Sequence, residues 1–355
     1  MSAYNFCMRL LIADTIFPKG HCCLNKHLLE ILLRNEKIAE VKLIDYQDYY
    51  ANHSNKVTSY NVSFLFKSKN AYLNYICQFL NSILIVFLCL RIRYDKVFFF
   101  TFDTLSFTFL RLVICKPIYL FHHNNTDHLL NKYKRKIFKT YMNKVNHVVF
   151  ADFIKDYLVS IGVSANRIFV ISHPLPDLSF TSKMQNTNGP NMYIALGHAN
   201  DENIIHDLIE YEKQKHCLER NNIHLVLRTQ NSFNELPLSI NIVTGFLAEE
   251  HYIDYYRKAK GVLILYPDYF KYRFSGVLLD ALVAKKKVIG RNIPIVRYYA
   301  QRYPSCCSFF EGVDDLMKKI LLDNIALNVN EEVYTSFLSA HSDQVITSQL
   351  NEILL

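Results

Sequence analysis

The chain has 355 residues, of which 50% are hydrophobic and 20% charged, so it can bury the cores of two domains. Its formal charge of +8 indicates an anionic partner, such as a nucleotide, a lipid phosphate or an anionic membrane surface. It has neither a concentrated basic stripe nor a nucleic-acid-binding module, so we expect no nucleic-acid partner.

The nine cysteines show neither a CxxC motif nor a Cys/His spacing typical of metal sites. An odd number of cysteines in a chain of this size favours reduced thiols in a cytosol. The opening residues, MSAYNFCMRLLIAD, lack the regions of a signal peptide. These features predict a cytoplasmic protein, either free or peripheral at the inner face of the membrane.

The first half alternates strand and helix patterns, which predicts a parallel sheet. A strand at Met8 to Ala13 precedes a helix at 24–33, and the polar residues 45–69 predict loops with one strand near 62–66. A helix follows at 72–92. Its apolar run, Ile76 to Leu90, is too short to span a bilayer, so it is either a buried helix or a helix that contacts a membrane surface.

Two strands are then predicted at 96–102 and 117–121, and the second ends in a polar cluster that begins with His122 and His123. Ligands of open parallel sheets bind beyond the carboxyl ends of the strands, which makes this cluster a candidate site. Two adjacent side chains cannot point the same way, so only one of the two histidines is the candidate. The alternative is that they are polar residues of an ordinary loop. A zinc site that adds His128 lacks a recognisable fourth ligand, so we expect no metal.

The segment 131–145 is predicted to be a basic amphipathic helix, either solvated or in contact with an anionic membrane. A strand at 147–151, a helix at 153–161 and a strand at 168–171 complete this half. Residues 180–191 have linker composition. We therefore place one domain at 1–180 and a second at 190–334.

The second half repeats the alternation, with strands predicted at 192–197, 224–229, 240–246 and 262–267 and helices at 203–219 and 249–260. The first of these strands ends in Gly197, and Arg228 lies at the end of the second. No G-x-G-x-x-G follows the first strand of the chain, and no Walker A motif occurs, which argues against a dehydrogenase and a P-loop NTPase.

The stretch 266–290, YPDYFKYRFSGVLLDALVAKKKVIG, predicts a strand end, a polar loop, a short helix and a return strand. Ser275 can cap the helix, Gly276 admits close approach of a ligand, and Asp280 follows one turn later. The unpaired N–H groups of a helix start can hold a phosphate, and Arg273 adds positive charge just before it. The alternative is an ordinary βαβ helix with a solvated Asp280.

The run from Tyr272 to Ile289 resembles the donor-binding signature of family 4 glycosyltransferases and their relatives of the GT-B fold, in which two acids are separated by seven residues and the second is followed by Ala. Asp280, followed by Ala281, matches the second acid, and Tyr272 stands at the position of the first. The resemblance implies that Asp280 holds the nucleotide ribose and that position 272 contacts the donor sugar.

The same resemblance implies roles for the other candidates. The loop at Gly197 would approach the diphosphate, Arg228 would meet the phosphates, and His122 or His123 would lie near the donor sugar. The loop with Lys19 and His21 would face the cleft or lie in solvent. Residues 335–355 would pack back onto the first domain.

The sequence therefore predicts an α/β protein of two Rossmann-like domains facing a cleft, the GT-B fold. Its expected activity is a metal-independent, cofactor-free transfer of a sugar from a nucleotide-sugar donor to a glycan or lipid-linked acceptor, in surface polysaccharide biosynthesis, with retention implied by the resemblance. A hexosyltransferase with a peripheral membrane contact fits this expectation. The alternatives are a nucleotide-sugar epimerase on the same fold and a non-catalytic nucleotide-binding relative.

Overall fold

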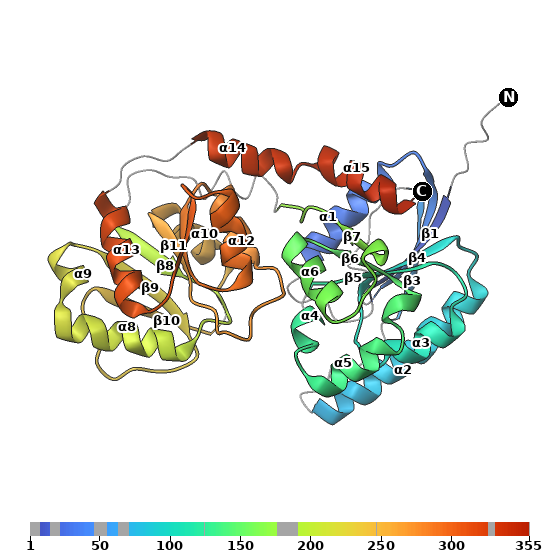
Figure 1. Cartoon of the computed structure of the whole chain (residues 1–355), viewed down its shortest axis with the longest axis horizontal. Helices are drawn as coiled ribbons and strands as arrows, with labels where there is room; N and C mark the ends of the chain where they lie inside the picture. Colours follow the sequence, from blue (N-terminus) through green and yellow to red (C-terminus); the bar gives the residue numbers. More distant parts are fainter. Residues whose placement is uncertain are drawn as a thin grey trace. The chain divides into compact units, whose positions relative to one another are not determined.

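A computed structural model describes residues 8–14, 22–45, 55–62, 71–123, 125–175, 191–245, 247–325 and 331–354. The chain divides into two compact units (Figure 1). The first contains Met1–Pro174, Tyr272–Phe274 and His341–Leu355, and the second contains Leu175–Lys271 and Ser275–Ala340. The predicted loop with Lys19 and His21, most of the strand near 62–66 and nearly all of the linker at 180–191 lie outside the described residues.

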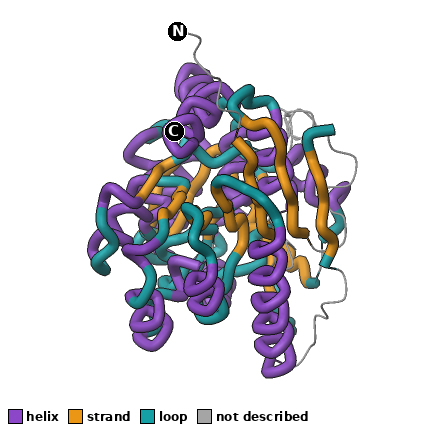
Figure 2. The backbone as a smooth tube through the Cα atoms, turned by 90° about the vertical axis from the view of Figure 1, so that its right-hand side faces the viewer, coloured by secondary structure: helices purple, strands orange, loops and turns teal. Residues whose placement is uncertain are grey.

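The first unit is built on a parallel sheet of seven strands in the order β3-β2-β1-β4-β5-β6-β7. Figure 2, which faces this unit, shows the strands side by side with helices around them. The strands are β1 (Met8–Asp14), β2 (Ile38–Asp45), β3 (Val57–Asn61), β4 (Lys96–Thr101), β5 (Ile118–Phe121), β6 (Asn146–Val149) and β7 (Ile168–Val170).

Most helices of the first unit lie between its strands in the sequence, and α15 comes from the end of the chain. They are α1 (Cys22–Leu33), α2 (Ala71–Arg91), α3 (Phe107–Val113), α4 (Asn125–His128), α5 (Lys132–Lys139), α6 (Asp152–Ser160) and α15 (Asp343–Leu354), with 3-10 turns at Met142–Lys144 and Ala165–Arg167.

The second unit is built on a parallel sheet of six strands in the order β10-β9-β8-β11-β12-β13. Its strands are β8 (Met192–Ala195), β9 (His224–Thr229), β10 (Ile240–Thr244), β11 (Gly261–Ile264), β12 (Lys287–Arg291) and β13 (Cys307–Phe310). Its helices are α8 (Glu202–Lys215), α9 (Cys217–Arg220), α10 (Glu249–Lys258), α11 (Gly276–Val283), α12 (Pro294–Arg302), α13 (Val313–Ile325) and α14 (Glu331–Ala340).

Both sheets have the doubly wound order, in which the chain adds strands on one side of the first strand and then crosses to the other side. This confirms the predicted α/β class with two Rossmann-like units. Strand β4 shows why the pattern was readable: Val97, Phe98, Phe99 and Phe100 are all fully buried, as expected of a central strand covered on both faces.

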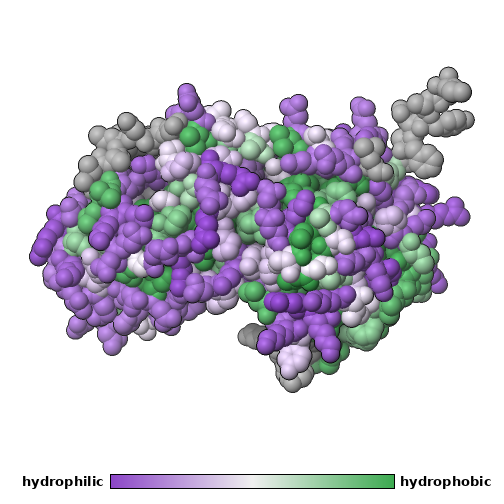
Figure 3. Space-filling model, viewed as in Figure 1, coloured by the Kyte–Doolittle hydropathy of each residue, from purple (hydrophilic) through white to green (hydrophobic). Residues whose placement is uncertain are grey.

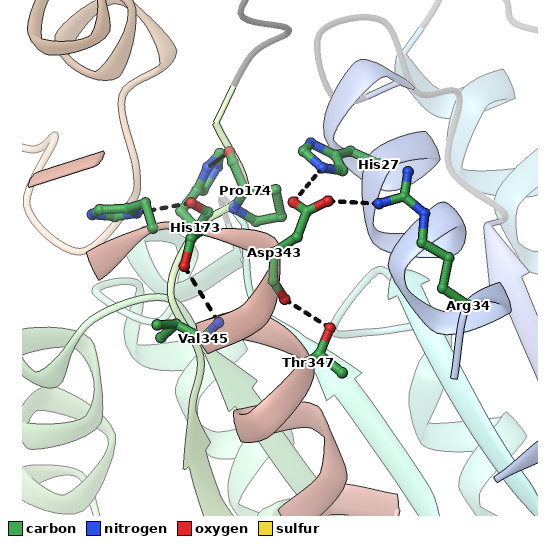
Figure 4. A network of polar contacts seen from close by, with 9 residues as sticks. His27, Arg34, His173, Pro174, Asp343, Val345 and Thr347 are labelled. Carbon is green, nitrogen blue, oxygen red and sulfur yellow. Dashed lines mark hydrogen bonds and ion pairs between the residues drawn. The ribbon is translucent and has the colours of Figure 1, made fainter. Parts of the chain in front are cut away.

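Helix α15 belongs to the first unit although it lies at the far end of the chain. Asp343 accepts 2.8 Å contacts from His27 Nε2 of α1 and from Nη1 of Arg34, which directly follows α1, and Thr347 donates to the carbonyl of Asp343 (Figure 4). At the other end of α15, Lys96 Nζ donates to the carbonyls of Ile353 and Leu354, both at 2.9 Å. These bonds hold both ends of the helix.

Several predicted elements differ from the observed ones. The helix predicted at 131–145 ends at Lys139, and the one at 203–219 is divided by His216, whose left-handed backbone (φ 48°) ends α8. The patterns of β2, α3, α12, β13 and α13 gave no prediction. Six cysteines whose side chains are described are free: Cys77, Cys89, Cys115, Cys217, Cys306 and Cys307. No helix among the described residues combines the length and apolarity needed to cross a bilayer.

Candidate functional site

In the second sheet, the side on which successive strands are added reverses between β8 and β11. These two strands are hydrogen-bonded neighbours although two other strands separate them in sequence. The loops that leave the carboxyl ends of these strands diverge, and the space between them is where doubly wound sheets bind ligands. Gly197 follows β8, and Tyr266 follows β11. The candidate site is therefore built from this point.

Gly197 and Tyr266 pack so closely that no side chain fits between them. A Cβ on Gly197 would lie 2.7 Å from Cε1 of Tyr266 and 3.1 Å from Oδ1 of Asn200. The Tyr266 ring stacks on Phe270 at a centroid distance of 4.1 Å, and its hydroxyl lies 2.8 Å from Oγ of Ser275. The loop after β8 is thereby connected through Tyr266 to the start of α11.

Helix α11 begins as the sequence predicted. Ser275 is its N-cap, with extended backbone, and its Oγ accepts the backbone N–H of Leu278 at 3.2 Å. Gly276 is exposed, and a Cβ there would have no atom within 4 Å. The first turn therefore presents backbone N–H groups at an open surface, where the helix dipole favours an anion.

Asp280 lies one turn into α11, half-buried, and its Oδ2 accepts a 2.8 Å hydrogen bond from the hydroxyl of Tyr252. The hydroxyl of Tyr256 lies 3.1 Å from that of Tyr252 and donates to the carbonyl of Val277 at 3.0 Å. Burial raises the pKa of Asp280 to about 6, and the Tyr252 hydrogen bond lowers it in part. The other carboxylate oxygen is the candidate ribose acceptor.

Arg228, at the end of β9, links the strand ends around it. Its Nε and Nη2 donate to the carbonyl of Gly245 at 3.1 and 2.8 Å, and its Nη1 donates to the carbonyl of Leu196 at 3.4 Å. Asn200 strengthens this edge by donating to the carbonyls of Ala195 and Arg228. The guanidinium keeps further N–H groups, because these three bonds use three of its five donors.

Tyr272 and Arg273 belong to the first unit, where both have partners. Asp127 there accepts the backbone N–H of Tyr272 at 2.6 Å and pairs with Nε of Arg273. The Tyr272 ring stacks on Tyr157, with centroids 3.6 Å apart. The carboxylate of Asp127 thus offsets the positive charge that the sequence analysis assigned to the helix start.

The two histidines differ in their surroundings. His122 is buried between Phe102 and Phe138, and its Nε2 lies 2.9 Å from Nδ1 of His147, whose Nε2 donates to the carbonyl of Met142. This relay requires Nε2–H on both rings, and desolvation holds the pKa of His122 well below its usual value. His122 is therefore a core residue, contrary to its candidacy for the reaction centre.

His123 is also buried, and its ring lies 5.1 Å from that of Phe150. It is the second residue after β5, within the polar cluster that the sequence analysis identified, and it remains the candidate of the pair. Among the described residues, no group of three His, Cys, Asp or Glu side chains could hold a metal ion.

The three lysines after α11 have separate partners. Lys285 pairs with Glu331 at 2.5 Å, Lys286 donates to the carbonyl of Ala259 at 2.8 Å, and Lys287 pairs with Asp323 at 2.7 Å. Local sequence patterns could not supply these partners, since each lies at least 27 residues away. The lysines hold the second unit together.

Tyr252, Tyr266 and Asn200 are site residues that sequence reasoning missed. Tyrosines are numerous in this chain, 24 in all, so no single one stood out. Only the position of Tyr266, directly after a buried strand, could have indicated its part in the site.

The sequence matches no protein-family model, and no curated protein matches it either. Solved structures do match. A glycosyltransferase from Rickettsia africae has a TM-score of 0.67 at 13% identity, with 98% of this chain and 97% of that chain covered. HepE from Anabaena, in complex with UDP and glucose, has a TM-score of 0.66 at 12% identity, with 98% and 99% covered.

The lipopolysaccharide outer core galactosyltransferase WaaB matches with a TM-score of 0.63 at 13% identity, and 98% of each chain is covered. The chain has the GT-B fold. The predicted fold class is thereby confirmed, and at these identities the likeness concerns the fold.

Proposed function

We propose that the protein is a glycosyltransferase that moves a sugar from a nucleotide-sugar donor to an acceptor. The arrangement at the switch point of the second sheet carries this proposal. There, Ser275 caps a helix whose first turn is open at Gly276, and Asp280 follows four residues later. A phosphate at the helix start and a ribose hydroxyl at the carboxylate would use both features.

The fold supports the same activity. HepE was solved in complexes with UDP, with UDP and glucose, and with UDP-glucose, and WaaB is a galactosyltransferase by its description. Departure of a nucleoside diphosphate places negative charge on the leaving phosphate, and fixed N–H donors stabilise such charge without rearrangement. The first turn of α11 and the remaining donors of Arg228 are suited to that task.

Finer features are part of the proposal. The protein would be a hexosyltransferase related to family 4 that retains configuration, needs no metal or cofactor, and acts in the cytoplasm on a glycan or lipid-linked acceptor in polysaccharide biosynthesis. His123 would lie near the donor sugar. A nucleotide-sugar epimerase is not favoured, because none of the similar structures named above is described as one.

The test is calorimetric titration of the full chain with UDP-, GDP-, ADP- and dTDP-sugars, together with slow hydrolysis of the bound donor. The decisive variant is Gly276→Asp. An acid at the first helical position interacts favourably with the dipole, by about 0.3 to 1 kcal/mol, but it repels a phosphate. We expect one donor class to bind, and this variant to lose at least about tenfold in affinity while keeping its melting temperature.

The matched control is Gly312→Asp. Gly312 lies directly before α13, its carbonyl accepts the N–H of Leu316 at 2.9 Å, and a Cβ there would have no atom within 4 Å. This control should bind the donor as the unchanged protein does. Absence of binding to every donor, or equal binding by Gly276→Asp, would contradict the proposal. Binding without any release of sugar would leave a nucleotide-binding protein that is not a transferase.

A further inference from the structure

Helix α2 of the first unit has its polarity inverted. Asn81 and Ser82, the polar residues that interrupt its apolar run, are buried together with Ile85 and Cys89. Leu80 and Ile83, on either side of the buried polar pair, are each 52% exposed. A solvated surface helix shows the opposite arrangement, with apolar residues inward and polar residues outward. Of the two alternatives predicted for this helix, complete burial is therefore wrong for its outer face.

The exposed apolar side chains form one continuous surface, which we name the α2–α3 face. On α2 most of them recur every three or four residues, which places them along one side of the helix. The neighbouring helix α3 adds two more, and the rings of Phe79 and Phe109 meet edge to face at 5.3 Å. The members, each 42 to 77% exposed, are Leu73, Ile76, Phe79, Leu80, Ile83, Phe87, Leu90, Phe109 and Leu112.

Figure 3 shows this face as a hydrophobic (green) band over α2 and α3, at the lower right of the view. Scattered apolar residues are normal on a protein surface, but a contiguous group of nine large side chains marks an interaction surface.

The segment of the sequence that contains the α2–α3 face is strongly positive. Residues 49–151 contain 14 Lys and Arg but only three acids, a net charge of +11 that exceeds the +8 of the whole chain. Of the three acids, Asp95 is paired with Arg9 and Asp127 with Arg273. Arg91 and Arg93 are exposed at the end of α2, and the Arg91 guanidinium lies 4.2 Å over the Phe87 ring.

A second copy of the chain would match the α2–α3 face poorly. A symmetric dimer brings the same surface to itself, so the basic residues around the face would need acidic partners on the same face. No Asp or Glu occurs between residues 49 and 94, and the positions beside the apolar row lack the charges that specify helix pairing. An anionic lipid surface supplies both the apolar phase and the negative charge.

We propose that the α2–α3 face binds the surface of an anionic phospholipid bilayer, with α2 lying in the plane of the interface. Its apolar side chains would enter the boundary between headgroups and acyl chains, as those of interfacial helices do. Arg91 and Arg93 would meet lipid phosphates at the edge of the face. This proposal does not depend on the transferase activity.

The test is sedimentation of the full chain with vesicles of phosphatidylcholine alone or mixed with an equal amount of phosphatidylglycerol. We expect binding to the anionic vesicles, weakened by salt, and little binding to the neutral ones. Leu80→Gln combined with Ile83→Gln should lose at least about tenfold in binding, since both side chains leave the acyl boundary. Arg91→Gln combined with Arg93→Gln should lose about as much, and only on anionic vesicles.

The matched control for the apolar pair is Leu238→Gln with Leu322→Gln in the second unit, where both side chains are exposed at 89% and 67%. It should bind vesicles as the unchanged protein does. Absence of vesicle binding at low salt, or equal loss in the control, would overturn the proposal. So would a dimer in analytical ultracentrifugation that the Leu80/Ile83 variant converts to monomer, because a second copy would then cover the face.

Discussion

The hydroxyl of Tyr252 donates a 2.8 Å hydrogen bond to Oδ2 of Asp280, joining helix α10 to the first turns of α11. The bond favours the ionised carboxylate, whereas burial favours the protonated acid and raises its pKa to about 6. The proposed ribose acceptor therefore changes its charge close to physiological pH, and the tyrosine controls where it does so.

We predict that donor affinity rises as pH increases through about 6, because only the carboxylate accepts two hydrogen bonds without a competing proton. The measurement is calorimetry between pH 5 and pH 8 with the nucleotide sugar, whose phosphates do not titrate in this window. Tyr252→Phe should move the midpoint to higher pH, since the ionised form loses a donor. Asp280→Asn should remove the pH dependence. A midpoint that stays in place in Tyr252→Phe would contradict this account.

Gly197→Ala should destabilise the second unit by about 1 to 3 kcal/mol, because its Cβ would lie 2.7 Å from the Tyr266 ring, which Phe270 and Ser275 hold in place. Donor affinity should fall as well, because a displaced Tyr266 would also shift Ser275, the N-cap of α11. Urea unfolding and calorimetry measure the two effects. Gly276→Ala is the control: it has open space around the new Cβ and should keep or slightly raise stability.

Arg228→Gln should lower the affinity for a nucleoside diphosphate by about tenfold and that for the nucleoside much less, if its guanidinium meets the phosphates. Equal losses for both ligands would assign Arg228 to anchoring alone, through the carbonyls of Gly245 and Leu196. Arg220→Gln, on the exposed end of α9, is the control for loss of one positive charge and should change neither affinity.

The His122–His147 pair should make the first unit sensitive to acid. Burial lowers the pKa of His147 from 6.5 to about 4, so the unfolded chain binds a proton that the folded chain resists. The unfolding free energy should be at its full value above pH 6.5. It should fall by about 3 kcal/mol as pH decreases to 4, because of protonation of His147 alone. His122 acts in the same direction.

The measurement is urea unfolding between pH 7.5 and pH 4.5. Replacing both histidines by leucine should flatten the pH dependence, whatever its effect at pH 7.5. The exposed His206, replaced in the same way, should leave the slope unchanged. A slope that is the same with and without the buried pair would show that other groups determine it.

Features that depend on neighbouring residues in the sequence were predictable. The N-cap at Ser275, the open Gly276 and the position of Asp280 all follow from a pattern within one short helix. Strand β4 was equally clear because its residues are continuously apolar. Strand β2 was missed because the charged Glu40 and Lys42 interrupt its apolar pattern. The two side chains pair with each other on the strand.

Features that depend on distant partners were not predictable. Asp127 and Arg273 are 146 positions apart, and no local pattern around either residue indicates that the two side chains form an ion pair. His122 and His123 look alike in sequence, and only the packing of Phe102, Phe138 and His147 makes the first a core residue. The pairing of Tyr252 with Asp280 is of the same kind.

The bonds that α15 makes to α1 and β4 connect residues more than 250 positions apart, across the whole second unit. The second unit, apart from three residues, is continuous in sequence, so it can complete its core while the first still lacks a helix. Closing a loop of that length costs only slightly more conformational entropy than closing a shorter one. However, the contacts of α15 cannot form until the end of the chain is available. Folding of the first unit is therefore expected to finish last, although its strands are the first to be synthesised.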